Sequence, residues 1–138
     1  MPSKHTVEKA RKELREGKSP KTAAGEFVHE EIEHVRRGKH GARSPRQAIA
    51  IGLSEARRAG IPVRPPKKNA SAATTKRAER DYKQGQSSSA KKTSRTRSKA
   101  RLKAMKREPK NTASRAALSR HAQAAARRRQ SAAHRKAA

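Results

Sequence analysis

The sequence contains no cysteine and no tryptophan, and it has one phenylalanine and one tyrosine among 138 residues. The absence of cysteine excludes disulfides and thiolate metal sites, and it is typical of proteins from a reducing cytosol. The longest apolar run, residues 48–53, is far shorter than the about 20 residues that cross a membrane. The first residues also lack the apolar stretch of a signal peptide. We therefore expect a cytoplasmic protein that has no membrane partner.

Acidic residues are scarce, with 11 Asp and Glu against 38 Lys and Arg, and the excess charge is unevenly distributed. Residues 1–66 hold 15 Lys and Arg against 8 Asp and Glu, a net charge of +7, whereas residues 67–138 hold 23 against 3, a net charge of +20. Only 30% of the residues are hydrophobic, too few to bury a core of the full length. The composition predicts a small folded part and a basic remainder that becomes compact on an anionic partner.

Three segments of the first half predict a small helical module over residues 1–62. The segment 6–16 is a short helix, and the segments 19–38 and 44–60 each combine a serine cap, late arginines and a glycine stop. We expect the second and third helices to pack as a helix-turn-helix hairpin, with the first helix beside them. The expected core consists of Phe27, Val28, Ile32, Val35, Ile49, Ile51 and Leu53.

Small residues mark one face of the third segment. Ala48, Gly52 and Ala56 recur at every fourth position and leave a shallow groove, in which the backbone of the second helix is expected to lie. The tetrads SPKT (19–22) and SPRQ (44–47) resemble histone-tail repeats that lie in the minor groove of DNA. Because each tetrad also stands where a helix begins, we favour the capping interpretation.

The second half predicts a different kind of chain. A linker rich in Pro, Lys and Ala at 63–73 leads into a low-complexity basic tail at 74–138. Helices are expected at about 74–84, 93–107 and 113–134, but only conditionally, because few large apolar residues could anchor them. The predicted fold class is thus mostly α, with a largely disordered or conditionally helical tail.

The clustered basic residues of the tail predict contacts with the phosphates of nucleic acid. The expected contact residues are Lys91, Lys92, Arg95, Arg97, Lys99, Arg101, Lys103, Lys106, Arg107, Arg115, Arg120, Arg127, Arg128 and Arg129. A secondary basic patch around the hairpin turn consists of Arg36, Arg37, Lys39, Arg43 and Arg46. Stacking on unpaired bases needs aromatic side chains, which are almost absent, so a duplex is favoured over a single strand. No zinc-finger or zipper pattern provides base readout, and we expect little sequence specificity.

The stretch HEEIEH (29–34) raises a metal hypothesis. His29 and His34 are five residues apart, so both cannot bind one ion from the same helix, and a single Glu-x-x-His pair, Glu31 and His34, falls short of a di-iron site. We favour an acidic helix face with the pairs Glu30/His34 and Glu33/Arg37, and we expect no metal. The sequence also shows no phosphate-binding loop and no nucleophile with a base, so we expect neither a cofactor nor enzymatic activity.

The run GEFVHEEIEHVRRGKHGARSPRQAIAIGLSEARRAG resembles a family of small, basic, uncharacterised bacterial proteins, some of which carry the label plasmid stabilisation protein. TASRAALSRHAQAAARRR (112–129) is similar to the tail of longer members, and the tail composition is also similar to linker-histone arms. The resemblance implies a role on DNA without catalytic residues.

These observations together predict a non-enzymatic protein that binds duplex DNA with little sequence specificity, of nucleoid-associated or plasmid-maintenance type. The helical pair would add self-association, which raises avidity by presenting several tails together. Two alternatives stay open. The helical pair binds a protein partner while the tail only localises it, or the tail binds structured RNA or the ribosome.

Overall fold

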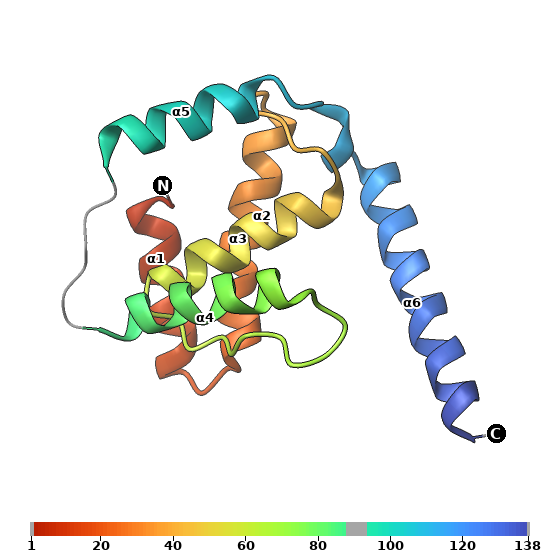
Figure 1. Ribbon diagram of the computed structural model, residues 1–138. Helices are drawn as coiled ribbons and strands as arrows, with labels where there is room; N and C mark the ends of the chain where they lie inside the picture. Colours follow the sequence, from red (N-terminus) through yellow and green to blue (C-terminus); the bar gives the residue numbers. More distant parts are fainter. Residues whose placement is uncertain (1, 88–93, 138) are drawn as a thin grey trace.

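The regular structure of the protein is entirely helical in the computed structural model, which describes residues 2–87 and 94–137 (Figure 1). This confirms the mostly α class that the sequence predicts. The elements are α1 (Lys4–Arg15), α2 (Pro20–Arg36), α3 (Pro45–Arg58), α4 (Ala72–Gln86), α5 (Arg95–Lys106), the short 3-10 helix η1 (Asn111–Ala113) and α6 (Arg115–Ala137).

Serine side chains begin five of these helices. In each, the hydroxyl accepts a hydrogen bond of 3.2 Å from the backbone N–H three residues later. The capping residues are Ser3, Ser19, Ser44, Ser71 and Ser114. The capping interpretation of the two Ser-Pro tetrads is therefore confirmed. The predicted stops of α2 and α3 are also present, because Gly38 and Gly60 adopt positive φ angles of 72° and 91°.

The centre of the fold is the crossing of α2 and α3 (Figure 1). Gly52 of α3 faces the backbone of Val28, and a Cβ at Gly52 would lie 2.7 Å from Val28 Cα. The predicted close approach at the small-residue face of α3 is thus confirmed. Beside the crossing, Phe27 is fully buried among alanines of α1, α2 and α3. Ile61 and Val63, which follow α3, belong to the same cluster.

The core is filled by alanine more than the sequence pattern suggests. Of the expected core residues, three are buried, and the other four are only half-buried. The buried ones are Phe27, Val35 and Ile51, and the half-buried ones are Val28, Ile32, Ile49 and Leu53. A second small cluster joins Val35 to Ala42, Ala48 and Ala113, with Ile32 packed against it.

The prediction of a long, largely disordered tail is wrong. α4 packs along α3, where Gly85 lies so close that a Cβ would overlap the Arg57 carbonyl oxygen. The Ser54 hydroxyl of α3 also donates a 2.6 Å hydrogen bond to Asp81 of α4. The scarcity of large apolar residues predicts no such contact, because small residues and hydrogen bonds make it.

The last two helices lie at the periphery of the molecule. α5 passes above the first three helices, and α6 leaves them after its first turns and projects away (Figure 1). Both helices are formed in the described structure, from Arg95 to Lys106 and from Arg115 to Ala137. The expectation of a largely disordered tail is therefore wrong for these two segments as well. Within the described residues, no helix has both the length and the apolar character needed to cross a membrane.

Candidate nucleic-acid interface

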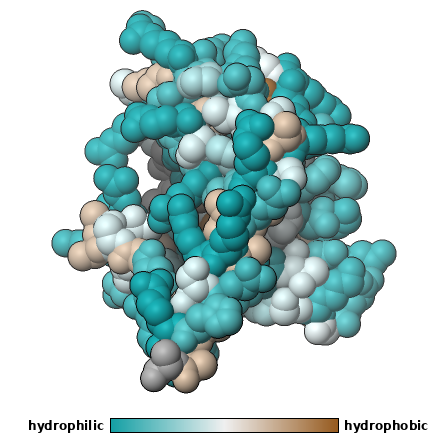
Figure 2. Space-filling model, turned by 90° about the vertical axis from the view of Figure 1, so that its right-hand side faces the viewer, coloured by the Kyte–Doolittle hydropathy of each residue, from teal (hydrophilic) through white to brown (hydrophobic). Residues whose placement is uncertain are grey.

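α5 and α6 are strongly basic helices at the periphery of the molecule. The sequences of these two helices hold 13 Lys and Arg and no Asp or Glu, and neither helix has a buried residue. Figure 2, which looks at the molecule from the side that carries α6, shows a mostly hydrophilic face with scattered white and light-brown residues. The predicted contact residues Arg95, Arg97, Lys99, Arg101, Lys103, Lys106, Arg107, Arg115, Arg120, Arg127, Arg128 and Arg129 are all exposed. Lys91 and Lys92 lie outside the described residues.

Local sequence explains why α6 is a continuous helix without a packed face. Its 23 residues are rich in alanine, the residue with the highest helix propensity. Ser114 caps its start by accepting a 3.2 Å hydrogen bond from the Ala117 N–H. The consecutive Arg127, Arg128 and Arg129 point in three directions around the axis, because successive helical residues are about 100° apart. The positive charge therefore surrounds α6.

The segment between α5 and α6 is fixed to the first helices through backbone hydrogen bonds. Gly41 N–H donates to the Met105 carbonyl at 2.8 Å, and Ala42 N–H donates to the Pro109 carbonyl at 2.9 Å. The Thr112 hydroxyl donates to the Ala42 carbonyl at 2.8 Å. No periodicity in the sequence indicates this docking, since it depends on main-chain groups.

The secondary basic patch is partly used to hold the structure together. Arg36 donates a 2.8 Å hydrogen bond from Nε to the Ala113 carbonyl and also pairs with Glu33 at 3.2 Å. Arg37 lies 3.6 Å from the same carboxylate, and Arg43 lies 3.4 Å from Glu108. Lys39 and Arg46 are exposed. The patch is thus less available to an external anion than α5 and α6.

One hollow brings the two predicted basic groups together. It lies between the start of α3 and the start of α6, and Arg43 from the patch and Arg120 from the tail both line it. The other lining residues are Ser44, Pro45, Asn111, Thr112, Ala117 and His121. The N-terminus of α3 opens here, and its dipole adds to the positive potential of the two arginines.

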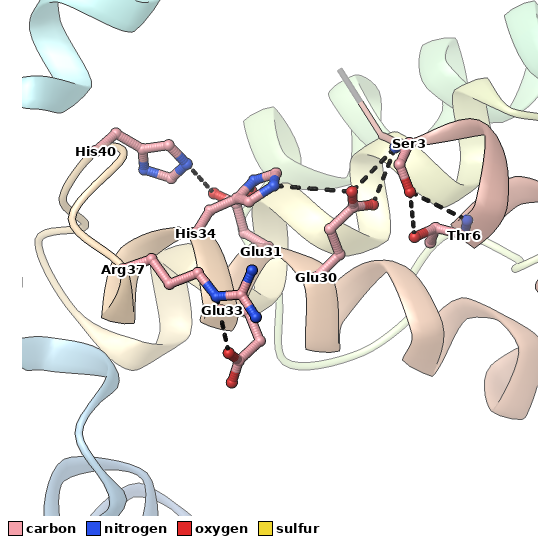
Figure 3. A network of polar contacts seen from close by, with 8 residues as sticks. All are labelled: Ser3, Thr6, Glu30, Glu31, Glu33, His34, Arg37 and His40. Atoms are coloured by element: carbon pink, nitrogen blue, oxygen red, sulfur yellow. Dashed lines mark hydrogen bonds and ion pairs between the residues drawn. The ribbon is translucent and has the colours of Figure 1, made fainter.

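The acidic residues of the motif HEEIEH contact basic side chains of α2 and of the loop that follows it (Figure 3). The two expected pairs are confirmed, with Glu30 at 3.7 Å from His34 and Glu33 at 3.6 Å from Arg37. Burial would raise the pKa of the Glu30 carboxyl, but hydrogen bonds from Thr6 and Ser3 lower it below its ordinary value.

Glu31 and His40 are a buried pair that the sequence reasoning missed. Glu31 Oε1 lies 3.2 Å from His40 Nε2, and both side chains are almost inaccessible to solvent. Burial raises the pKa of the Glu31 carboxyl. His40 lies in the loop beyond Gly38, which ends α2. The spacing of residues along a helix therefore does not predict its contact with Glu31.

Part of the chain is similar to a known protein family. Residues 2–69, just under half of the chain, match a family of unknown function (DUF6496). No curated protein and no solved structure matches the chain. The matched region ends before α4, so the basic helices α5 and α6 lie outside it.

Proposed function

We propose that this protein binds duplex nucleic acid, DNA in preference to RNA, through its phosphate backbone and with little dependence on sequence. The observation that carries the proposal is the surface of α5 and α6, which presents 13 Lys and Arg without a single acidic residue. Phosphates are the abundant anions that such a surface attracts, and their contacts release condensed counterions. The helical module serves to hold these two helices, and the protein is not an enzyme.

The shape of α6 supports a duplex as the ligand. A helix of 23 residues is about 34 Å long, which is about one turn of B-DNA. Its side chains are mostly alanine between the arginines, so it is slim enough for the B-DNA major groove, which is about 12 Å wide. Arginines on all sides of the helix can then reach the phosphates of both groove walls.

The same geometry favours DNA over double-stranded RNA. The major groove of A-form RNA is deep and narrow and does not admit a helix in this way. Binding to chromosomal or plasmid DNA without sequence preference would place the protein on the nucleoid. Base-specific readout is not part of the proposal, since arginines directed at phosphates carry no sequence information.

The test compares two variants of equal charge in the full-length chain. One variant replaces Arg127, Arg128 and Arg129 of α6 with glutamine. The control replaces Lys4, Arg11 and Arg15 of α1 with glutamine, and these residues are also exposed. We expect the α6 variant to lose affinity for a random duplex by about tenfold or more at low salt, because about three phosphate contacts are removed. The control should stay within about twofold of the unmodified protein.

Equal losses in the two variants would show that only net charge matters, and would contradict the role of α6. A duplex affinity that neither variant changes would also contradict it, since other residues would then make the phosphate contacts. Self-association through the helical pair stays a prediction, and the apparent mass in solution measures it. Among the described residues, Leu102 of α5 is the only large apolar residue that is largely exposed to solvent, with 43% of its surface accessible.

A further inference from the structure

Three side chains that can bind a metal converge at the end of α2. Glu31 and His34 come from the helix, and His40 comes from the loop that follows it. One ligand atom from each lies within 4.8 Å of the other two. Figure 3 shows His40 directed at Glu31, with His34 beside them. Gly38 reverses the chain between the two histidines, and their rings meet edge to face at 5.9 Å between centroids.

The cluster contains an unsatisfied buried carboxylate oxygen. The side chain of Glu31 is 2% exposed, and its Oε1 accepts no hydrogen bond from the described residues. The atom nearest to it in the pair is His40 Nε2, at 3.2 Å, and the His40 side chain is 7% exposed. An anionic oxygen left without a donor in the interior is costly, so this position favours a cation.

The proton on His40 is placed by its other neighbour. His40 Nδ1 lies 3.0 Å from the Gly41 carbonyl oxygen, and a carbonyl can only accept a hydrogen bond. Nδ1 therefore carries the proton, and in the neutral ring the lone pair is on Nε2, the nitrogen that faces Glu31. Two electron-rich atoms then point at each other, which is the arrangement of two ligands around a metal ion.

His34 is supported in the same way. Its Nδ1 lies 3.7 Å from Glu31 Oε2, and its Nε2 lies 3.7 Å from Glu30 Oε1. Glu30 is held in place by Ser3, whose backbone N–H donates to its carboxylate at 3.0 Å. Metal-binding histidines commonly have a carbonyl or carboxylate behind the ring, which orients it and fixes the proton. Here Gly41 stands behind His40, and Glu30 stands behind His34.

We propose that Glu31, His34 and His40 form a binding site for a divalent transition-metal ion, with zinc as the best match. Two imidazoles and a carboxylate suit zinc, whose bonds to such ligands are about 2.0–2.2 Å long. Ligand atoms around a tetrahedral ion are then about 3.4 Å apart. Here the two carboxylate oxygens of Glu31 lie 3.2 Å from His40 Nε2 and 3.7 Å from His34 Nδ1, and one ligand atom from each residue lies within 4.8 Å of the others. The ion would join the end of α2 to the loop that bonds to α5 through Gly41 and to η1 through Ala42.

Titration of the full-length chain, first treated with a chelator, with zinc alone tests this site. We expect one zinc ion per chain and a rise in the unfolding temperature as zinc is added, since an ion that binds only the folded state stabilises it. Cobalt at the same site should give the visible absorption bands of a tetrahedral complex. The net charge of +27 disfavours adventitious cation binding elsewhere on the surface.

Two ligand variants, one variant of the carboxylate behind His34 and two controls complete the test. His40→Gln and Glu31→Gln should each abolish the zinc-dependent rise and weaken binding by about 100-fold or more, whereas Glu30→Gln, behind His34, should weaken it by about tenfold. His29→Gln and His5→Gln, at exposed positions, should leave binding unchanged.

Zinc affinity that is equal in all five variants, or no binding by the unmodified chain, would overturn the site and leave His40 and Glu31 as an ion pair. Circular dichroism identifies a variant that fails to fold, and the cobalt spectrum of the unmodified chain still decides in that case. Metal binding is measured without nucleic acid, so this outcome is independent of the proposed function.

Discussion

Gly52 of α3 lies against the backbone of Val28 of α2, where a Cβ on Gly52 would lie 2.7 Å from Val28 Cα and 2.9 Å from Val28 N. The two helices approach backbone to backbone at this position. The rest of the interface is made largely of alanine. The distance between the two helices is therefore set at Gly52, which has no side chain to hold them apart.

The first prediction concerns the effect of a single methyl group at two glycines. Gly52→Ala should destabilise the protein by about 1–3 kcal/mol, because the added carbon overlaps the α2 backbone. Gly25→Ala should instead stabilise it by about 0.5–1 kcal/mol, since no atom lies within 4 Å of its added Cβ and alanine favours a helix. Chemical denaturation of both variants measures the difference. Equal effects would contradict the close crossing.

The second prediction separates capping from DNA contact at the Ser-Pro tetrad of α3. Ser44→Ala removes a side-chain cap and should cost about 1 kcal/mol of stability. Ser94→Ala is the matched control, because Ser94 stands at the start of α5 without a side-chain hydrogen bond. Thermal unfolding should show a loss for Ser44→Ala alone. If Ser44→Ala weakened duplex binding while leaving stability unchanged, the minor-groove interpretation of the tetrad would return.

The third prediction addresses the attachment of the basic helices. Ala113 is fully buried against Val35 and Ala48, so Ala113→Glu would place a charge in this cluster and should destabilise the protein by more than about 2 kcal/mol. Ala116→Glu, in the exposed first turn of α6, adds the same charge and should have little effect on stability. A small and equal change in the two unfolding temperatures would show that the segment before α6 does not dock.

The fourth prediction follows from a half-buried carboxyl group on α3. Burial raises the pKa of Glu55, although the charge of Arg58 lowers it in part. A carboxyl whose pKa is higher in the folded than in the unfolded state loses stability as pH rises through the folded pKa. Glu55→Gln removes this loss, so its unfolding temperature should exceed that of the unmodified protein at about pH 7, and the gap should close towards about pH 4. Glu79→Gln, at an exposed position, should show no such pH-dependent gap.

The fifth prediction distinguishes DNA from RNA. In competition for the full-length chain, a DNA duplex should displace the bound probe at a lower concentration than an RNA duplex of equal length, because the A-form major groove does not admit α6. Equal competition would mean that binding occurs over the outside of the phosphate backbone. A preference for RNA would favour the structured RNA or ribosome alternative.

The first half of the fold could be predicted because its signals are local. Serine caps at Ser19 and Ser44 and the glycine stops at Gly38 and Gly60 depend on residues within one helical turn. The groove at Gly52 is also visible as a small-residue repeat. The burial of Ile61 and Val63 was missed, because these residues follow α3 in an extended segment without a periodic pattern.

The attachment of the second half could not be predicted, since main-chain groups make it. Nothing in the residue types of Gly41 or Ala42 indicates that their N–H groups bond to the Met105 and Pro109 carbonyls. The same reason applies to the proposed metal site, which joins a helix to a loop through His40. The basic character of α5 and α6, by contrast, was evident from composition alone.

The central claim is that α5 and α6 bind a duplex through its phosphates, and the salt dependence of affinity tests it most directly. The measurement is the dissociation constant of the full-length chain for a random duplex of about 30 base pairs, from about 50 to about 300 mM salt. If about 10 phosphates are contacted, the logarithm of the association constant should fall with the logarithm of salt concentration with a slope near about −9. Weak binding that is insensitive to salt would contradict the claim.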